Sequence, residues 1–177
     1  IILMVPAILF AISVHEFAHG MMANRLGDPT PKYQGRLTLN PMAHLDPLGA
    51  LMLVLFRFGW AKPVMVNPLY FKDRRRGMML VGLAGPAANV VSAWVFRLLL
   101  GILPTLFSFR VGLVLHQFIL LNIAINLGLA AFNLIPIPPL DGSKILAGIL
   151  PARYEVTFQR LEAYGPALLL VLLFTGI

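Results

Sequence analysis

The sequence predicts an all-α polytopic membrane protein, a bundle of about four or more transmembrane helices. Of its 177 residues, 59% are hydrophobic and only 12% are charged, whereas soluble domains carry roughly a quarter charged residues. The apolar residues also gather into separate runs, several of them near the roughly 20 residues that a helix needs to cross a bilayer core. The absence of cysteine excludes a secreted, disulfide-stapled fold.

Four segments have the composition of a span: residues 1–24, 77–101, 111–135 and 161–177. Three arginines precede the second span, and Pro136 ends the third. The first opens inside an apolar run without an initiator methionine, so we expect sequence upstream of it to be missing. The fourth is short for a span, and we expect it to be cut off by the end of the chain.

Between the first two spans the chain becomes rich in proline and glycine. Residues 48–60 (LGALMLVLFRFGW) are apolar but too short for a spanning helix, and residues 33–40 (YQGRLTLN) partly alternate polar and apolar side chains. Such alternation is typical of strands. We therefore expect a small membrane-dipping β/loop element here, covered by the helices because open strand edges are not tolerated in lipid.

The net charge of +7 is explained by topology. Nine of the 14 Lys and Arg residues lie within 25–76, whereas the loop after the second span offers only Arg110. Because cytoplasmic loops carry the excess of basic residues, we predict a protein of the cell membrane whose segments 25–76 and 136–160 face the cytoplasm. The basic residues are not interleaved with stacking aromatics, so we expect the lipid bilayer as a partner and no nucleic acid.

The first span carries three ionisable side chains together, His15, Glu16 and His19. Each such residue costs roughly 2.5–3.5 kcal/mol on insertion scales and usually marks a function. Positions i and i+4 share a helix face, so both imidazoles can reach one ion, and Zn²⁺ suits neutral imidazole. Glu16 stands beside them as a candidate base. The alternative, a chance HExxH in an ordinary helix, leaves three polar groups in lipid without a partner.

Two histidines do not complete a catalytic zinc site. The candidates for a third ligand are His44, Asp46, His116, Asp141 and Glu162. His116 begins the third span on the outer side, whereas the HExxH pair lies within about 14 Å of the cytoplasmic end of its helix, so we expect His116 to be a packed or interfacial residue. Glu162 opens the fourth span and fits a helix-start acid.

Asp141 lies at the matching depth. It follows the third span within residues 133–142 (NLIPIPPLDG), where three prolines forbid a regular helix. Unwound backbone at membrane depth needs protein or a wet cavity around it, and a carboxylate there favours a cation nearby. In the alternative interpretation, Asp141 caps the helix that begins near Gly142.

With HEFAH and NLIPIPPLDG in this order on apolar segments, the chain resembles the site-2 proteases, intramembrane zinc metalloproteases of peptidase family M50. The resemblance covers nearly the whole chain, including residues 39–49 (LNPMAHLDPLG), 59–64 (GWAKPV) and 84–89 (AGPAAN). It implies hydrolysis of peptide bonds within or near transmembrane segments of membrane-protein substrates, as in regulated intramembrane proteolysis.

The resemblance also implies roles for single residues. His15, His19 and Asp141 would bind one Zn²⁺ per chain, Glu16 would be the catalytic base, and Asn133 would help to hold the substrate or the oxyanion. The active site would face the cytoplasmic side. We expect one protease domain over residues 1–177, without a PDZ or CBS domain in it.

Two further polar residues have two interpretations each. Asn89 either donates to the substrate or oxyanion or joins helices by hydrogen bonds. His44 either forms a turn with Asp46 or approaches the site as a gate.

Two rival functions are weighed against proteolysis. A metal transporter also uses His and Asp on broken helices, but it needs polar groups at several depths, and here they gather near one side. An inactive binding scaffold of the same family would lack the glutamate or a ligand, and this chain keeps all of them.

Overall fold

The computed structural model describes residues 2–56, 61–151, 153 and 164–165. Within this part of the chain the regular secondary structure is helical throughout. The elements in order are α1 (Met4–Arg25), α2 (Thr30–Tyr33), the 3₁₀ turn η1 (Pro41–Ala43), α3 (Pro47–Phe56), η2 (Pro68–Tyr70), α4 (Arg74–Leu100), η3 (Leu103–Leu106), α5 (Phe109–Asn133) and α6 (Asp141–Ile149).

Three stretches are long and apolar enough to cross a membrane: Met4–Arg25, Arg74–Leu106 and Phe109–Asn133. They coincide closely with the first three predicted spans, and they make the chain an integral membrane protein. The fourth predicted span, 161–177, lies outside the described residues except for 164–165.

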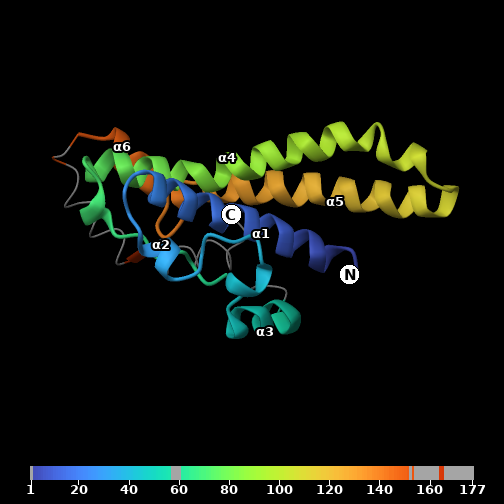
Figure 1. The fold of residues 1–177 in the computed structure, drawn as a ribbon, viewed down its shortest axis with the longest axis horizontal. Coiled ribbons are helices and arrows are strands. Elements are labelled where there is room, and N and C mark those ends of the chain that lie inside the picture. The colour runs from blue at the N-terminus through green and yellow to red at the C-terminus, as the bar shows by residue number, and fades with distance from the viewer. Residues whose placement is uncertain (1, 57–60, 152, 154–163, 166–177) are drawn as a thin grey trace.

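The three long helices lie side by side, with α4 and α5 joined by η3 as an antiparallel pair and α1 packed along both (Figure 1). Small residues at the contacts let helices approach closely in a membrane, and the buried positions of these helices are rich in alanine and glycine. Large apolar side chains face outward, as a lipid-facing surface requires: Val90, Val91, Trp94, Leu98, Leu113, Val114, Leu120 and Leu127.

Helix α6 packs against α4 at the end of the bundle where α4 begins (Figure 1). Asp73 caps α4 by accepting a hydrogen bond from the backbone N–H of Arg76 at 3.1 Å. The Arg75 guanidinium donates to the carbonyls of Ala147 and Leu150. Because these are carbonyls at the C-terminal end of α6, Arg75 ties that end to the first turn of α4.

The β element predicted between the first two spans is wrong for the described residues. Within the apolar stretch 48–60, the chain forms α3 up to Phe56. A short apolar run fits a helix or a strand equally well by periodicity alone, and residues 57–60 lie outside the described part.

Residues 33–40 also form no strand. The chain turns at Gly35, where φ is +66°, and the side chains of Thr38 and Asn40 accept hydrogen bonds from nearby backbone N–H groups. Such local bonds compete with strand pairing. In the described part of this loop, Leu45 and Ala61 form an isolated antiparallel β-bridge.

Candidate metal centre

Two side chains of α1 and the first residue of α6 converge inside the bundle. The Nε2 atoms of His15 and His19 are 3.0 Å apart, and they lie 3.1 Å and 3.0 Å from Oδ2 of Asp141. All three side chains are buried. Together they form a group that could hold a metal ion, so the three predicted ligands are brought to one point.

The spacing and chemistry of these atoms fit a small divalent cation. Ligand atoms bound tetrahedrally at about 2.0–2.1 Å lie roughly 3.3 Å from one another, close to the three separations observed here. Each Nδ1 faces an oxygen acceptor: His15 Nδ1–H donates to Asn89 Oδ1 at 2.6 Å, and His19 Nδ1–H donates to the Val81 carbonyl at 2.7 Å. With their protons on Nδ1, both Nε2 lone pairs point toward Asp141, an arrangement that a cation stabilises.

The third ligand reaches the histidines because the chain folds back sharply after α5. A side chain at Gly142 would collide with the carbonyl oxygens of Leu134 and Ile135, so glycine lets the proline-rich loop lie against the end of α5. Asp141 is then the first residue of α6, and Leu140 before it is the N-cap residue. The capping interpretation of Asp141 is therefore wrong, because Asp141 lies one position past the N-cap and its carboxylate lies beside the two imidazoles.

Lys144 completes the surroundings of Asp141. Its Nζ lies 3.0 Å from Oδ1, the carboxylate oxygen that faces away from the histidines. Burial by itself raises the pKa of the Asp141 carboxyl, but its contacts with His15 and His19 and the nearby charge of Lys144 hold that pKa well below its usual range. Asp141 is therefore ionised, which is the form that binds cations.

Helix α4 approaches the cluster through Gly85. A Cβ at this position would lie 2.5 Å from His19 Nε2 and 2.6 Å from His15 Cε1. Glycine is required here because the backbone of α4 lies against the imidazole rings. The sequence does not predict Gly85 or Lys144 as part of the site, although Gly85 lies in the AGPAAN stretch and Lys144 stands three residues after Asp141.

Glu16 lies on α1 next to His15 and is half-buried. Its Oε2 accepts a hydrogen bond from the Val64 backbone N–H at 3.0 Å. Residues 62–67 have no regular structure, and they bring this N–H from the loop to α1. The candidate base is thus held in place by a backbone donor.

The other predicted residues lie outside the cluster. The side-chain amide of Asn133, half-buried at the end of α5, donates to the Leu129 carbonyl of its own helix at 3.0 Å. His116 is exposed on α5. Glu162 lies outside the described residues. The substrate role of Asn133 stays a prediction.

His44 is fully buried, but not as the predicted turn with Asp46. Its Nε2–H donates to the Thr38 carbonyl at 2.8 Å, while the Asp46 carboxylate accepts from the Gly49 backbone N–H. The predicted pairing of His44 with Asp46 is wrong, because each side chain bonds to a backbone group instead and His44 Nδ1 has no hydrogen-bond partner among the described residues. The gate role of His44 stays a prediction.

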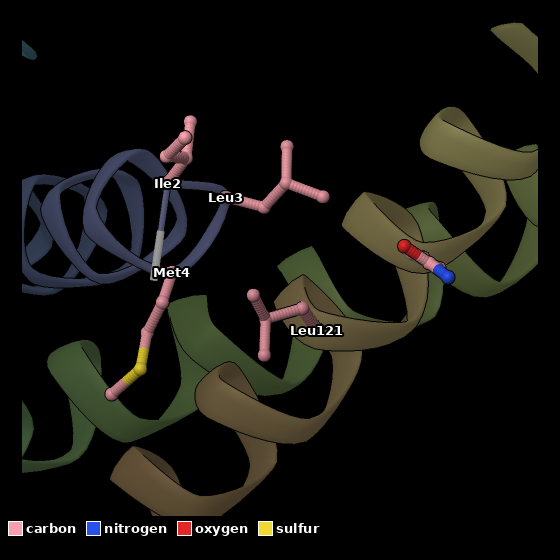
Figure 2. A pocket seen from close by; sticks show the side chains of 5 residues that line it. Ile2, Leu3, Met4 and Leu121 are labelled. Carbon is pink, nitrogen blue, oxygen red and sulfur yellow. The ribbon is translucent and has the colours of Figure 1, made fainter.

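An apolar pocket of about 630 Å³ lies at the other end of α1, lined by Ile2, Leu3, Met4, Gln117 and Leu121 (Figure 2). From Met4 to His15 the helix rises about 16 Å. The pocket is therefore separate from the metal cluster.

Comparison with known proteins agrees with this geometry. The model of peptidase family M50 matches residues 106–175. The relative named "Putative zinc metalloprotease YwhC" of Bacillus subtilis is 40% identical over 97% of this chain and 80% of its own length. Proteins described in the same words are Rip2 of Mycolicibacterium smegmatis, 31% identical over 98% of this chain and 67% of its own length, and MJ0611 of Methanocaldococcus jannaschii, 31% identical over 75% and 62%. No solved structure matches the chain significantly.

The buried His–His–Asp cluster is consistent with the zinc site of a metalloprotease. The chain belongs to peptidase family M50. The predicted resemblance to the site-2 proteases is confirmed at the level of the family.

Proposed function

We propose that the protein is a zinc-dependent intramembrane endopeptidase, which hydrolyses peptide bonds within or near transmembrane segments of other membrane proteins. The convergence of His15, His19 and Asp141 within 3.1 Å of one another carries this proposal. The cluster is buried among helices that are long and apolar enough to cross a membrane. A substrate that reaches it is therefore itself at membrane depth.

The chain's own residues account for binding and proton transfer. His15, His19 and Asp141 would hold Zn²⁺, which when bound supplies Lewis-acid chemistry, polarising a carbonyl and acidifying a water molecule. The Glu16 carboxylate accepts a proton from the attacking water and delivers it to the leaving amine. The Val64 N–H limits the positions that this carboxylate can adopt.

The basic residues support an orientation with the metal centre toward the cytoplasm. The loop between α1 and α4 and the segment that follows α5 hold most of the Lys and Arg residues, and the positive-inside rule assigns such segments to the cytoplasmic side. A soluble substrate region could enter there, whereas the outer loop near Arg110 is short.

Replacing Glu16 with Gln tests the proposal. The variant is expected to keep one zinc per chain, because no ligand is changed, and to lose cleavage by about 10²–10⁴-fold, the usual contribution of a positioned acid–base group. We would measure zinc by mass spectrometry of the purified protein and cleavage by comparing membrane proteomes of cells that make the wild type or the variant. Asp73→Asn is the matched control, because Asp73 is also an acidic residue but caps α4. This variant should cleave substrates at the wild-type level.

Three outcomes contradict the proposal. Wild-type protein that folds but never carries zinc would exclude a zinc enzyme. Transmembrane fragments formed equally with Glu16→Gln would remove Glu16 as the base, and zinc uptake into proteoliposomes by both proteins would favour the transporter.

A further inference from the structure

We propose that Asn89 and Asn126 form a positioning relay that fixes the His15 imidazole and directs its Nε2 toward the metal ion. The inference rests on the proposed function, because it takes the ion to be zinc. It assigns a task to α5, a helix that provides no ligand to the cluster.

Asn89 is the centre of the relay. Its side chain is fully buried on α4, and its Nδ2 donates to the Ala11 carbonyl of α1 at 3.0 Å and to Asn126 Oδ1 of α5 at 2.8 Å. A primary amide has two hydrogens, and both are used. Oδ1 is then the remaining polar atom of Asn89, and it lies 2.6 Å from Nδ1 of His15. The orientation of this amide is therefore set by its partners.

Asn126 is held in the same direction. It is fully buried, and its Nδ2 donates to the backbone carbonyl of Asn122 at 2.9 Å, which leaves Oδ1 to accept from Asn89. All the donors run one way: His15 donates to Asn89, Asn89 to Asn126, and Asn126 to a helix carbonyl. Moving the His15 proton to Nε2 would place a lone pair against Asn89 Oδ1, so the relay keeps Nε2 free for a metal.

His19 provides an internal comparison. It obtains the same orientation from the backbone carbonyl of Val81 at 2.7 Å, a partner that no side-chain substitution removes. His15 relies on the Asn89 side chain instead. Bulk water is scarce at this depth, so water does not readily replace this side chain as the acceptor. Outer partners of metal-bound histidine typically contribute about 10–100-fold in metal affinity.

The test is the zinc affinity of Asn89→Ala, measured on the detergent-solubilised full chain by competition with a chromophoric chelator. We expect zinc to bind about 10–100-fold more weakly, and the visible absorption of the Co²⁺-loaded variant to differ from that of the wild type. Asn89→Asp keeps an oxygen acceptor for His15 and should retain more affinity than Asn89→Ala. Asn126→Ala should fall between the wild type and Asn89→Ala, because Asn89 keeps its bond to Ala11.

Asn122→Ala is the matched control. Asn122 is also a fully buried asparagine of α5, but its Nδ2 donates to Phe118 of its own helix and its Oδ1 has no partner among the described residues. The backbone carbonyl that holds Asn126 survives this substitution. Zinc affinity and the Co²⁺ spectrum should therefore be unchanged.

Equal zinc affinity and an unchanged Co²⁺ spectrum in folded Asn89→Ala would overturn the relay. An equal loss in Asn122→Ala would overturn it too, because any buried asparagine would then have the same effect. If Asn89→Ala does not fold, Asn126→Ala and Asn89→Asp decide, and wild-type affinity in Asn126→Ala counts against the proposal. A wild type that binds no zinc refutes the proposed function instead, so the two failures are distinguishable.

Discussion

Gly85 sets how closely α4 can lie against the two histidines of α1. A Cβ at this position would lie 2.5 Å from His19 Nε2 and 2.6 Å from His15 Cε1. Both distances are shorter than any normal van der Waals contact. The neighbouring atoms are imidazole ring atoms near the metal-binding point and not the ends of flexible side chains. Any larger residue must therefore move a ligand or the whole helix.

Gly85→Ala is expected to weaken zinc binding at least tenfold and to lower the free energy of unfolding by about 1–3 kcal/mol, the usual cost of overpacking. Zinc content and thermal unfolding of the purified protein measure the two effects. Gly128→Ala on α5 is the control, because nothing lies within 4 Å of a Cβ at that position. Full zinc occupancy in Gly85→Ala would show that the rings are not packed as described.

The Val64 backbone N–H donates to one atom of the proposed base, Glu16 Oε2. Because proline has no backbone N–H, a proline at position 64 removes this hydrogen bond. Val64→Pro should lower kcat roughly 10- to 150-fold, since a hydrogen bond to a charged group contributes roughly 1.5–3 kcal/mol, while zinc content stays the same. Met65→Pro changes the neighbouring, exposed position and is the control. Unchanged kcat in Val64→Pro would indicate that Glu16 is oriented by other groups.

At the scale of the elements, α6 carries Asp141, and its position depends on glycines that let it lie against α4. A Cβ at Gly82 of α4 would be 3.1 Å from Lys144 Cβ, and a Cβ at Gly148 of α6 would collide with the Met79 side chain. Arg75 adds hydrogen bonds to the end of α6. The third ligand is thus placed by packing along the whole of α6.

Gly148→Leu is expected to weaken zinc binding although residue 148 is two turns from Asp141, because the larger side chain pushes α6 away from α4. Overpacking of this kind costs about 1–3 kcal/mol. We would measure zinc affinity and thermal unfolding beside Gly128→Leu, whose position on α5 is open. A variant with normal zinc affinity would mean that α6 is held by the loop before it.

At the scale of the whole molecule, the alternating directions of α1, α4 and α5 place the loop after α1 and the whole of α6 at the same end (Figure 1). The opposite end holds the short connection through η3. In a membrane the two ends lie on opposite sides, and the metal centre is nearer the end with α6.

This arrangement predicts labelling from opposite sides. Residues 1–177 contain no cysteine, so single cysteines can be introduced among them without removing others. Lys72→Cys should react with an impermeant maleimide after the cytoplasmic side is opened, and Phe107→Cys, 51% exposed beside η3, should react in intact cells. Labelling of both from one side would contradict the topology.

Much of the architecture and the metal-binding group could be predicted from the sequence. Apolar length fixes spans because a bilayer has a defined thickness, and the i, i+4 spacing places His15 and His19 on one helix face. Three prolines predict a break before Asp141. The loop between α1 and α4 could not be predicted in the same way, since α3 is a short apolar run that fits a helix or a strand.

By itself, the sequence determined that the chain crosses a membrane and that two histidines and an aspartate are available as ligands, because composition and local spacing are properties of neighbouring residues. The tertiary structure decided that Gly85 must be small, that Lys144 pairs with Asp141, and that Asn89 and Asn126 hold His15. These contacts join residues on different helices, so their distances are set by how the helices pack, and no local pattern encodes that packing.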